Sequence, residues 1–292
     1  MLYVPKAACS LMRKIYTEIH LDEFTQEQQF FLNKRGVHHL KDIHSIQDQG
    51  TEKSVNNFIV CRNPYTRCLS AFYDKFLFLN QEAIKDWHSY KTICFFELFL
   101  RTKEINVFQK AVLLDNSVFS SKVELVQFFE LLDLEYTQTE KYYTFEQYLT
   151  FLLFCKSNNL HTVENCIYDA HHDTQVTQQC MDFFEPKIIK IERFDLLLPH
   201  YKKILKRDYT SKETILKTNL YTNIYINSTP SKIDVDYDTS QWNKQQILDF
   251  LYKTDKLPSI KSMLTDVTLE LIHNIYDIDF KLLRYNKNQH EA

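Results

Sequence analysis

The sequence predicts an α/β fold in three layers, with a mostly parallel sheet flanked by helices. Three stretches predict it, because in each of them a short apolar run is followed by a helical pattern: residues 1–16, 57–76 and 188–205. In the third, a strand is expected over residues 188–192 and a helix over 196–205. Strands that alternate with helices in this way form a parallel sheet with helices on its faces. The second stretch is the clearest, since residues 58–61 form a continuous apolar run, which is typical of a strand buried on both faces.

Length and composition are those of an ordinary globular protein. The chain has 292 residues, enough for a core that needs no cross-links, and we expect a single domain over residues 1–292. It is 44% hydrophobic and 25% charged, and its net charge of −3 gives no sign of a nucleic-acid binder. Only Gly36 and Gly50 are glycines, so turns must use Asn, Asp, Ser and Pro, and glycine-rich phosphate loops are excluded.

The cysteines predict reduced thiols rather than disulfides or a zinc site. There are seven of them, an odd number, and no two have the spacing C-x-x-C. Reduced thiols indicate a cytoplasmic protein. The N-terminus lacks the charged and apolar segments of a secretion signal, and no apolar run reaches the ~20 residues that span a bilayer. We therefore expect no membrane anchor.

The first sixteen residues combine a short apolar strand, a tight loop and the start of an amphipathic helix. The loop reads PKAACS over residues 5–10 and carries Lys6. Such a loop directs several backbone N–H groups and the positive end of a helix dipole at one point, so it is a natural anion site. Lys6 adds a full positive charge. An ordinary strand-to-helix turn with a solvated lysine is the alternative interpretation.

A second candidate anion site follows the apolar run at residues 58–61. Asn63 and Pro64 are typical of the N-cap and first position of a helix, which then carries Ser70. Arg62 precedes them at the carboxyl end of the expected strand, where ligands of open α/β sheets bind. An arginine and a hydroxyl together suit a phosphate group. The alternative is a buried arginine that caps a carbonyl, beside a serine on a helix face.

Three histidines within seven residues, His38, His39 and His44, raise the question of a metal site. His38 and His39 are adjacent, so in a strand their side chains point to opposite faces. No carboxylate or cysteine stands at a convincing ligand spacing, and we expect no metal here. The simple interpretation of each is a solvated histidine. The alternative is an acid–base role, since histidine titrates near neutrality.

The two candidate anion sites carry a specific resemblance. PKAACS, followed by FIVCRNPYTRCLSAFYDKF over residues 58–76, resembles the two cofactor signatures of the sulfotransferases that use 3′-phosphoadenosine 5′-phosphosulfate (PAPS). The closer similarity is to the carbohydrate sulfotransferases of family 2, whose second signature has the form V-R-(D/N)-P-(F/Y)-x-R-x-x-S-A-(F/Y)-x-(D/N)-K-F. Cys61 and Cys68 fall at variable positions of that signature. The resemblance covers segments at both ends of the chain and several segments between them, whereas residues 103–141 have no counterpart in it.

This resemblance implies a role for each signature. The first loop would bind the 5′-phosphosulfate, with Lys6 at the leaving phosphate oxygen and the transferring sulfuryl group. The second would hold the 3′-phosphate through Arg62 and Ser70. The fold implied is the P-loop-like sulfotransferase fold, and no metal is required where a lysine and backbone amides neutralise the leaving group. The implied cofactor-binding residues are Pro5, Lys6, Ala7, Ala8, Cys9, Ser10, Arg62 and Ser70.

Several residues are candidates for the base that takes the proton of the acceptor hydroxyl. Residues 169–175 read DAHHDTQ and resemble a weak form of the family segment H-(W/F)-x-P-Q near the acceptor site, with His172 in place of the aromatic residue and Thr174 in place of the proline. A solvated turn is the alternative for this segment. Helix N-terminal electrostatics is the preferred interpretation of Glu146. The candidate bases are His171, His172, His38, His39 and Glu146.

Most of the remaining pattern predicts helices. Residues 103–141 are a possible helical insertion that shapes the acceptor site, with simple packing as the safer interpretation. Thr144 and Gln147 begin a helix with a capping box, Thr265 caps another, and residues 209–238, rich in Asn, Thr and Ser, predict a loop. Helical patterns extend over residues 92–108, 112–135, 242–252 and 266–279.

Together these features predict the transfer of a sulfuryl group from PAPS to a hydroxyl of a carbohydrate. PAPS is the expected co-substrate and a saccharide or glycolipid the expected partner, whereas neither a nucleic acid nor a metal is expected. One alternative is a catalytically inactive relative that binds a nucleotide or a glycan. The other is a nucleotide kinase, which is disfavoured because Lys6 precedes the loop and the chain has no Walker A motif.

Overall fold

The computed structural model describes residues 58–73, 87–118, 125–135, 143–161, 167–168, 171–192 and 231–288. By its internal contacts the chain divides into two units. Unit 1 joins Met1–Asn63 to Gln175–Thr229, and unit 2 joins Pro64–Thr174 to Pro230–Ala292. The single domain expected from the sequence stays a prediction. The strand, loop and helix expected over residues 1–16 lie outside the described residues, as do the helix expected over 196–205 and residues 209–230 of the expected loop.

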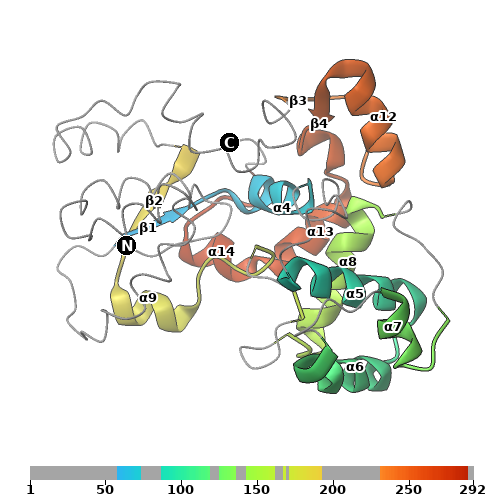
Figure 1. Cartoon of the computed structure of the whole chain (residues 1–292). Helices are drawn as coiled ribbons and strands as arrows, with labels where there is room; N and C mark the ends of the chain where they lie inside the picture. Colours follow the sequence, from blue (N-terminus) through green and yellow to red (C-terminus); the bar gives the residue numbers. More distant parts are fainter. Residues whose placement is uncertain are drawn as a thin grey trace, which may run out of the picture. The chain divides into compact units, whose positions relative to one another are not determined.

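A parallel pair of strands forms the centre of the described part of unit 1 (Figure 1). β1 (Phe58–Cys61) runs beside β2 (Lys187–Lys190), with Cys61 opposite Lys190. Val60 and Cys61 are buried, as the apolar run predicts. The Cys61 thiol donates a hydrogen bond to the carbonyl oxygen of Ile189 on the neighbouring strand. The strand and its parallel pairing agree with an α/β fold, and β2 ends two residues earlier than the sequence predicts.

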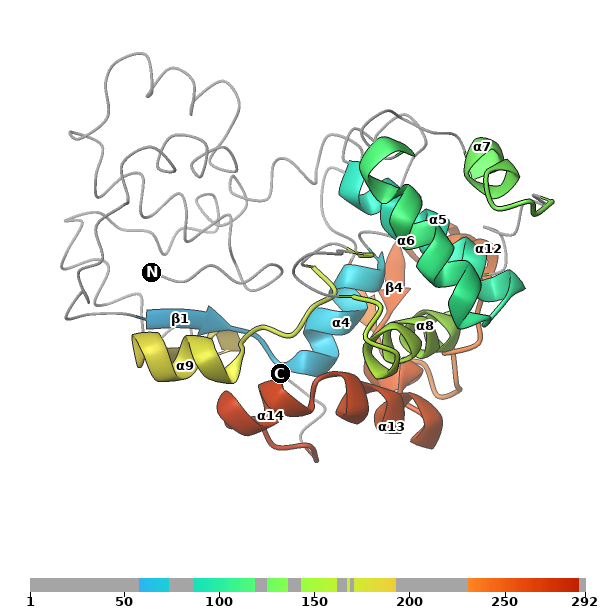
Figure 2. The same cartoon turned by 90° about the horizontal axis from the view of Figure 1, so that it is seen from below.

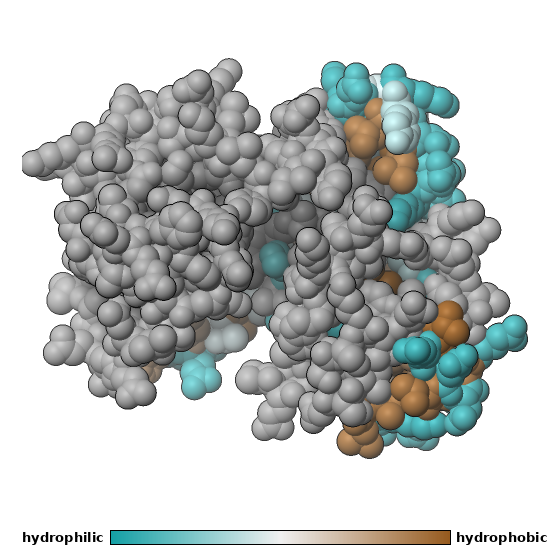
Figure 3. Space-filling model, viewed as in Figure 1, coloured by the Kyte–Doolittle hydropathy of each residue, from teal (hydrophilic) through white to brown (hydrophobic). Residues whose placement is uncertain are grey.

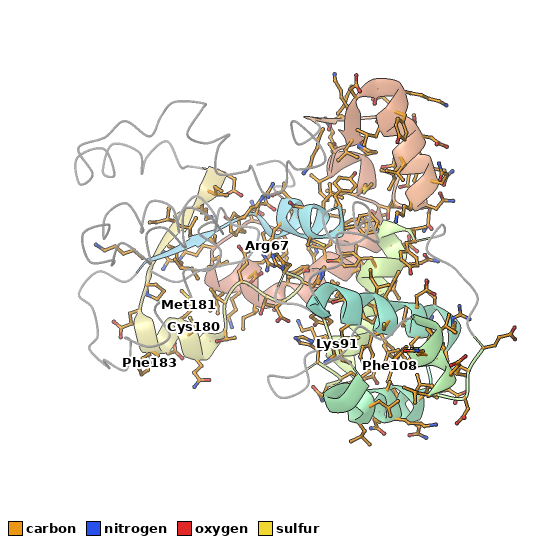
Figure 4. All side chains as sticks on the ribbon, viewed as in Figure 1. Arg67, Lys91, Phe108, Cys180, Met181 and Phe183 are labelled. Atoms are coloured by element: carbon orange, nitrogen blue, oxygen red, sulfur yellow. The ribbon has the colours of Figure 1, made fainter. Side chains whose placement is uncertain are left out.

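A short helix that the apolar periodicity does not predict leads into β2. α9 (Gln178–Phe184) begins after Thr177, whose side chain accepts a hydrogen bond from the Cys180 N–H at 3.1 Å. It ends at Glu185, which has the left-handed conformation with φ of 43°. Figure 4 shows Phe183 on this helix, where its ring is exposed. A helix of seven residues with an exposed aromatic ring has too little periodicity to be seen in the sequence.

Helix α8 (Phe145–Ser157) is the central element of unit 2. It packs against α4 (Pro64–Phe72), α5 (Trp87–Arg101) and α13 (Asp266–Ile275), and it lies between α5 and α13 in Figures 1 and 2. Its capping box is confirmed, because Thr144 Oγ1 accepts from the Gln147 N–H at 3.2 Å and Gln147 Oε1 accepts from the Thr144 N–H at 3.1 Å. The other helices of this unit described up to residue 135 are α4 (Pro64–Phe72), α5 (Trp87–Arg101), α6 (Ile105–Val118) and α7 (Leu125–Glu130).

Aromatic rings fill the core between these helices. Phe96 of α5 meets Phe151 of α8 edge to face, with ring centroids 5.4 Å apart. Phe108 of α6, labelled in Figure 4, lies 5.0 Å from Phe154 of α8. Rings in such geometries add to the hydrophobic gain of burial. The helices of the 103–141 segment therefore belong to the main core of unit 2. Figure 3 shows apolar surface over α6 and α7 as well, where Leu113 is exposed.

Two helices expected from the sequence are each broken in the structure. The pattern over 92–108 is divided between α5 and α6, because Thr102 Oγ1 accepts from the Glu104 N–H at 3.1 Å and so replaces a helical bond. The pattern over 266–279 is divided between α13 (Asp266–Ile275) and α14 (Asp277–Leu282) at Tyr276. The N-cap predicted at Thr265 is confirmed.

A strand–helix–strand unit follows in the C-terminal part of unit 2. β3 (Ser231–Ile233) pairs in parallel with β4 (Lys256–Pro258), and α12 (Lys244–Thr254) connects them. The prediction of a loop over 209–238 is wrong for the three residues of β3. Three-residue strands carry too short an alternation to be recognised. The helix expected over 242–252 is present and shifted by two residues.

The scarcity of glycine has a visible consequence at helix ends. Every left-handed position in the described part of the chain is held by a residue with a side chain. Asp and Asn fill most of them, because their short polar side chains tolerate this conformation best. The expectation that such residues replace glycine in turns is thus confirmed there. The positions are Asp133, Asn159, Glu185, Asp255 and Arg284, with φ of 43–58°.

Candidate active site

The chain leaves β1 and enters α4 through Arg62 and Asn63. α4 begins at Pro64, where the sequence predicts its first position, since the fixed φ of proline suits the first helical turn. Most of α4 is buried, and its half-exposed positions include Ser70. Arg62 is half-buried. Arg62 lies in unit 1 and Ser70 in unit 2, and the joint phosphate site expected for them stays a prediction.

The side chain of Gln175 is bonded to the backbone of Arg62. The Arg62 N–H donates to Gln175 Oε1 at 2.8 Å, and Gln175 Nε2 donates to the Arg62 carbonyl oxygen at 2.7 Å. Gln175 is only 8% exposed. One primary amide therefore satisfies both polar groups of a single backbone residue, as a neighbouring strand would. Gln175 is the last residue of the DAHHDTQ segment, and sequence reasoning gives it no role of its own.

A carboxylate holds the next backbone position. The Asn63 N–H donates to Glu192 Oε1 at 2.6 Å. Glu192 follows the end of β2, the strand that runs parallel to β1, so both strands end beside the same turn. A hydrogen bond to an ionised acceptor is short and about twice as strong as a neutral one. Two consecutive backbone N–H groups after β1 are thus fixed by side chains from other segments.

Arg67, the second arginine of the 58–76 signature, is a buried structural residue. It is 1% exposed and its Nη1 donates to the carbonyl oxygen of Asp173 at 2.6 Å (Figure 4). The carboxylate of Asp173 contacts His161 Nε2 at 3.1 Å. His161 Nδ1 accepts from the backbone N–H groups of Ile167 and Tyr168, so the ring proton is on Nε2 and points at Asp173. Arg67 and His161 together hold the loop that contains residues 171–173.

The two histidines of this loop have different surroundings. His172 is 1% exposed, so the interpretation as a solvated turn is wrong for this residue. Its Nδ1 lies 2.8 Å from the hydroxyl of Tyr148, and the hydroxyl of Tyr276 donates to its carbonyl oxygen at 3.0 Å. His171 is half-buried. The loop thus buries His172 among tyrosines and leaves His171 partly accessible.

Unit 1 and unit 2 each tie the 58–76 signature to the 171–175 segment, through Gln175 in the first and Arg67 in the second. A model of the sulfotransferase family, the family 2 group, matches residues 1–286.

The chain belongs to the sulfotransferase family. The match covers nearly the whole chain and includes residues 5–10, 58–76 and 169–175, where the resemblance was expected. Searches of curated proteins and of solved structures returned no match to this chain.

Buried thiols of the sulfotransferase have raised pKa values, Cys68 and Cys155 among them. Burial raises the pKa of Cys68 from its ordinary value of 9.0 to about 12, although hydrogen bonds from Tyr276 and Tyr148 and the charge of Arg67 lower it in part. Burial likewise raises the pKa of Cys155. A protonated thiol is inert at neutral pH. The cysteines of the described residues form no disulfide; they are Cys61, Cys68, Cys94, Cys155 and Cys180.

Glu146 lies at the start of α8, in its first turn. Its carboxylate accepts a hydrogen bond from Gln241 Nε2 at 2.5 Å. An acidic side chain there interacts favourably with the helix dipole, which agrees with the electrostatic interpretation of this residue. Its place among the candidate bases stays a prediction.

The residues of the first candidate anion site lie outside the described part of the chain: Pro5, Lys6, Ala7, Ala8, Cys9 and Ser10. The same holds for His38, His39 and His44. Within the described ranges no group of histidine, cysteine and carboxylate side chains is arranged to hold a metal ion. The helices of those ranges include none that is both long and apolar enough to cross a membrane.

Proposed function

We propose that this sulfotransferase transfers the sulfuryl group of PAPS to a hydroxyl of a carbohydrate. The observation that carries the proposal is the family match over residues 1–286, which contains both signature segments. The place of Arg62, directly after the carboxyl end of a parallel strand, supports it, because ligands of α/β sheets bind at such ends. The fold that we propose for the whole chain is a three-layer, P-loop-like single domain.

On the donor side, the chain's own groups supply charge and position. The bond between sulfur and the 5′-phosphate oxygen breaks, a bond from sulfur to the acceptor oxygen forms, and adenosine 3′,5′-bisphosphate leaves. Lys6 neutralises the charge that grows on the leaving oxygen, aided by the N–H groups of the PKAACS loop. Arg62 and Ser70 hold the 3′-phosphate, for which a guanidinium fork and a hydroxyl are suited.

On the acceptor side, His171 is the base that the geometry favours among the residues that the structure describes. A base must reach the acceptor hydroxyl, and His171 is only half-buried whereas His172 is fully buried among tyrosines. The acceptor proton moves to the imidazole nitrogen as the new sulfur–oxygen bond forms. His39, outside the described residues, is the second candidate. The acceptor is a saccharide or a glycolipid. We also propose a cytoplasmic location, which the odd number and scattered positions of the cysteines predict.

The cofactor is tested by calorimetric titration with adenosine 3′,5′-bisphosphate, adenosine 5′-monophosphate and ATP. Selective binding of the bisphosphate is expected, because Arg62 and Ser70 act on the 3′-phosphate. Preference for ATP would favour a nucleotide kinase, and binding of none of the three would contradict the PAPS assignment. Selective binding without any turnover on a panel of desulfated polysaccharides and glycolipids would favour an inactive nucleotide-binding relative.

Replacement of Arg62 tests the 3′-phosphate contact. Arg62→Ala is expected to weaken binding of the bisphosphate by about 1.5–3 kcal/mol, the range of a hydrogen bond to a charged group. Binding of adenosine 5′-monophosphate should not change. Arg62→Lys is the matched control, since it keeps the charge and loses the bidentate fork, and an intermediate loss is expected. Equal bisphosphate affinity in the wild type and in Arg62→Ala would show that Arg62 does not bind the 3′-phosphate.

Replacement of Lys6 tests the leaving-group role. Lys6→Ala is expected to abolish transfer of labelled sulfate from PAPS to the polysaccharide and glycolipid panel, with an unchanged unfolding midpoint. Lys14→Ala, in the helix expected after the same loop, is the control and should retain activity. A Lys6→Ala enzyme that turns over at the wild-type rate would show that this mechanism is wrong.

A further inference from the structure

The backbone of Arg62 is held from two sides at the point where the β1–β2 ladder ends. Cys61, opposite Lys190, is the last paired residue of β1. The next N–H and C=O groups along the chain, those of Arg62, are bonded to the amide of Gln175 at 2.8 and 2.7 Å. Gln175 therefore extends the hydrogen-bonding of the strand by one residue. Buried backbone groups need such partners, since an unpaired one costs free energy.

Glu192 adds a second constraint one residue further on. Its carboxylate accepts the Asn63 N–H at 2.6 Å, and Glu192 lies two residues beyond Lys190, the last residue of the neighbouring strand β2. With both bonds present, the peptide plane between Arg62 and Asn63 is fixed at its N–H end by Glu192 and at its C=O end by Gln175. A fixed peptide plane fixes the direction in which the Arg62 side chain leaves the backbone.

We propose that Gln175 and Glu192 are positioning residues that orient Arg62 toward the 3′-phosphate of the nucleotide. The inference rests on the proposed function, in which Arg62 binds that phosphate. Bidentate recognition by a guanidinium depends on the angle of its planar fork, so a pre-set arginine binds more tightly than one that must be ordered on binding. Gln175 itself is buried and bonded to backbone, which suits a positioning role rather than contact with the acceptor.

The test measures discrimination for the 3′-phosphate, as the ratio of the Kd of adenosine 5′-monophosphate to that of adenosine 3′,5′-bisphosphate. Gln175→Leu keeps the approximate volume and removes both hydrogen bonds. It is expected to lower the ratio by about tenfold, the factor that corresponds to about 1.4 kcal/mol. The Kd of the monophosphate should not move. Gln178→Leu is the control, because Gln178 is a nearby exposed residue whose amide bonds Asp182 on its own helix.

A double-mutant cycle separates positioning from a general loss of structure. In the Arg62→Ala background, Gln175→Leu is expected to leave the bisphosphate Kd unchanged, because there is no guanidinium left to orient. Additive losses would overturn the inference, as would equal losses of both nucleotides. If Arg62→Ala alone leaves the ratio unchanged, the 3′-phosphate contact in the proposed function is wrong, and the inference falls with it.

Glu192 supplies a second variant in case Gln175→Leu does not fold. Glu192→Ala removes the acceptor for the Asn63 N–H and is expected to lower the ratio several-fold. Glu192→Gln keeps an oxygen at the same place and should restore most of it. Equal ratios in the wild type and Glu192→Ala would overturn the role of Glu192, and a Glu192→Gln variant as impaired as Glu192→Ala would show that its charge, rather than the hydrogen bond, matters.

Discussion

The two arginines of the 58–76 signature differ in their surroundings although they are only five residues apart. Arg67 is buried and donates to the backbone of Asp173, whereas Arg62 is half-buried and its own backbone is held by Gln175. Loss of the buried guanidinium would leave a polar loop backbone without its partner. Arg67 therefore holds the backbone of the 171–173 loop, and Arg62 is the arginine to which the proposed function assigns the 3′-phosphate.

For single residues, the sequence predicts which side chains belong to the candidate site but not how they are oriented. The signature identifies Arg62 and Ser70 as candidate phosphate ligands. The strand and helix patterns place Arg62 in the turn between β1, which ends at Cys61, and α4, which begins at Pro64. Nothing in the sequence indicates that the amide of Gln175 faces the Arg62 backbone, because the two are 113 positions apart. The burial of His172 depends on Tyr148 and Tyr276, which reach it from distant helices.

The two loop histidines are expected to respond differently to substitution. His171→Gln should lower kcat by about 10²–10⁴-fold, the usual contribution of a general base, with an unchanged unfolding midpoint. His172→Gln should instead lower the free energy of unfolding by about 1–3 kcal/mol, because it disturbs the buried bond to Tyr148. The measurements are kcat and urea unfolding. A stable His172→Gln variant without turnover would make His172 the base, and full activity in both would favour His39.

At the scale of elements, local hydrogen bonds fix the helix starts. Thr144 and Thr265 are N-caps in the structure and both are predicted, because a cap is a short-range pattern of a hydroxyl and the residue three positions later. The breaks after Arg101 and at Tyr276 are not predicted, since apolar periodicity continues through them. The short strands β3 and β4 acquire their structure from pairing with each other, which no local pattern indicates.

The N-cap of α8 is expected to contribute measurably to the free energy of unfolding, because this helix is central to unit 2. Thr144→Ala removes the Oγ1 that accepts the Gln147 N–H and is expected to lower the free energy of unfolding by about 1 kcal/mol. Urea unfolding at neutral pH measures it. Thr144→Ser keeps the oxygen and serves as the matched control, with a loss well below that of the alanine variant. Equal losses in the two variants would show that the methyl group, rather than the cap, stabilises the helix.

At the scale of the whole molecule, many thiols and phenols are buried in neutral form. Burial raises the pKa of Cys68 and of Tyr65 to about 12, from ordinary values of 9.0 and 10.0. Among the described residues the pKa is raised by burial in others as well: Tyr73, Cys94, Tyr148, Cys155, Cys180 and Tyr276. Burial lowers the pKa of Lys156. This shift has the opposite effect on how stability changes with pH, but it concerns one group only.

These shifts predict that stability falls in alkaline solution. Above pH 9 the unfolded chain loses thiol protons that the folded chain keeps, so the unfolded state binds fewer protons and the free energy of unfolding decreases as pH rises. Each such group contributes a slope of up to about 1.4 kcal/mol per pH unit between its unfolded and folded pKa values. The stabilisation that the protonated Cys68 thiol contributes is fully present below pH 9 and is lost between pH 9 and about 12.

Urea unfolding at pH 8 and pH 10.5, with a reductant present, measures the effect. The midpoint is expected to be clearly lower at pH 10.5. Cys68→Ala is the internal control. It lowers the free energy of unfolding at pH 8, because it creates a small cavity. Between pH 8 and pH 10.5, however, its free energy of unfolding should fall less than that of the wild type, by about the amount that one buried thiol contributes. Equal midpoints at the two pH values in the wild type would mean that the buried thiols and phenols ionise in the folded chain as readily as in the unfolded one.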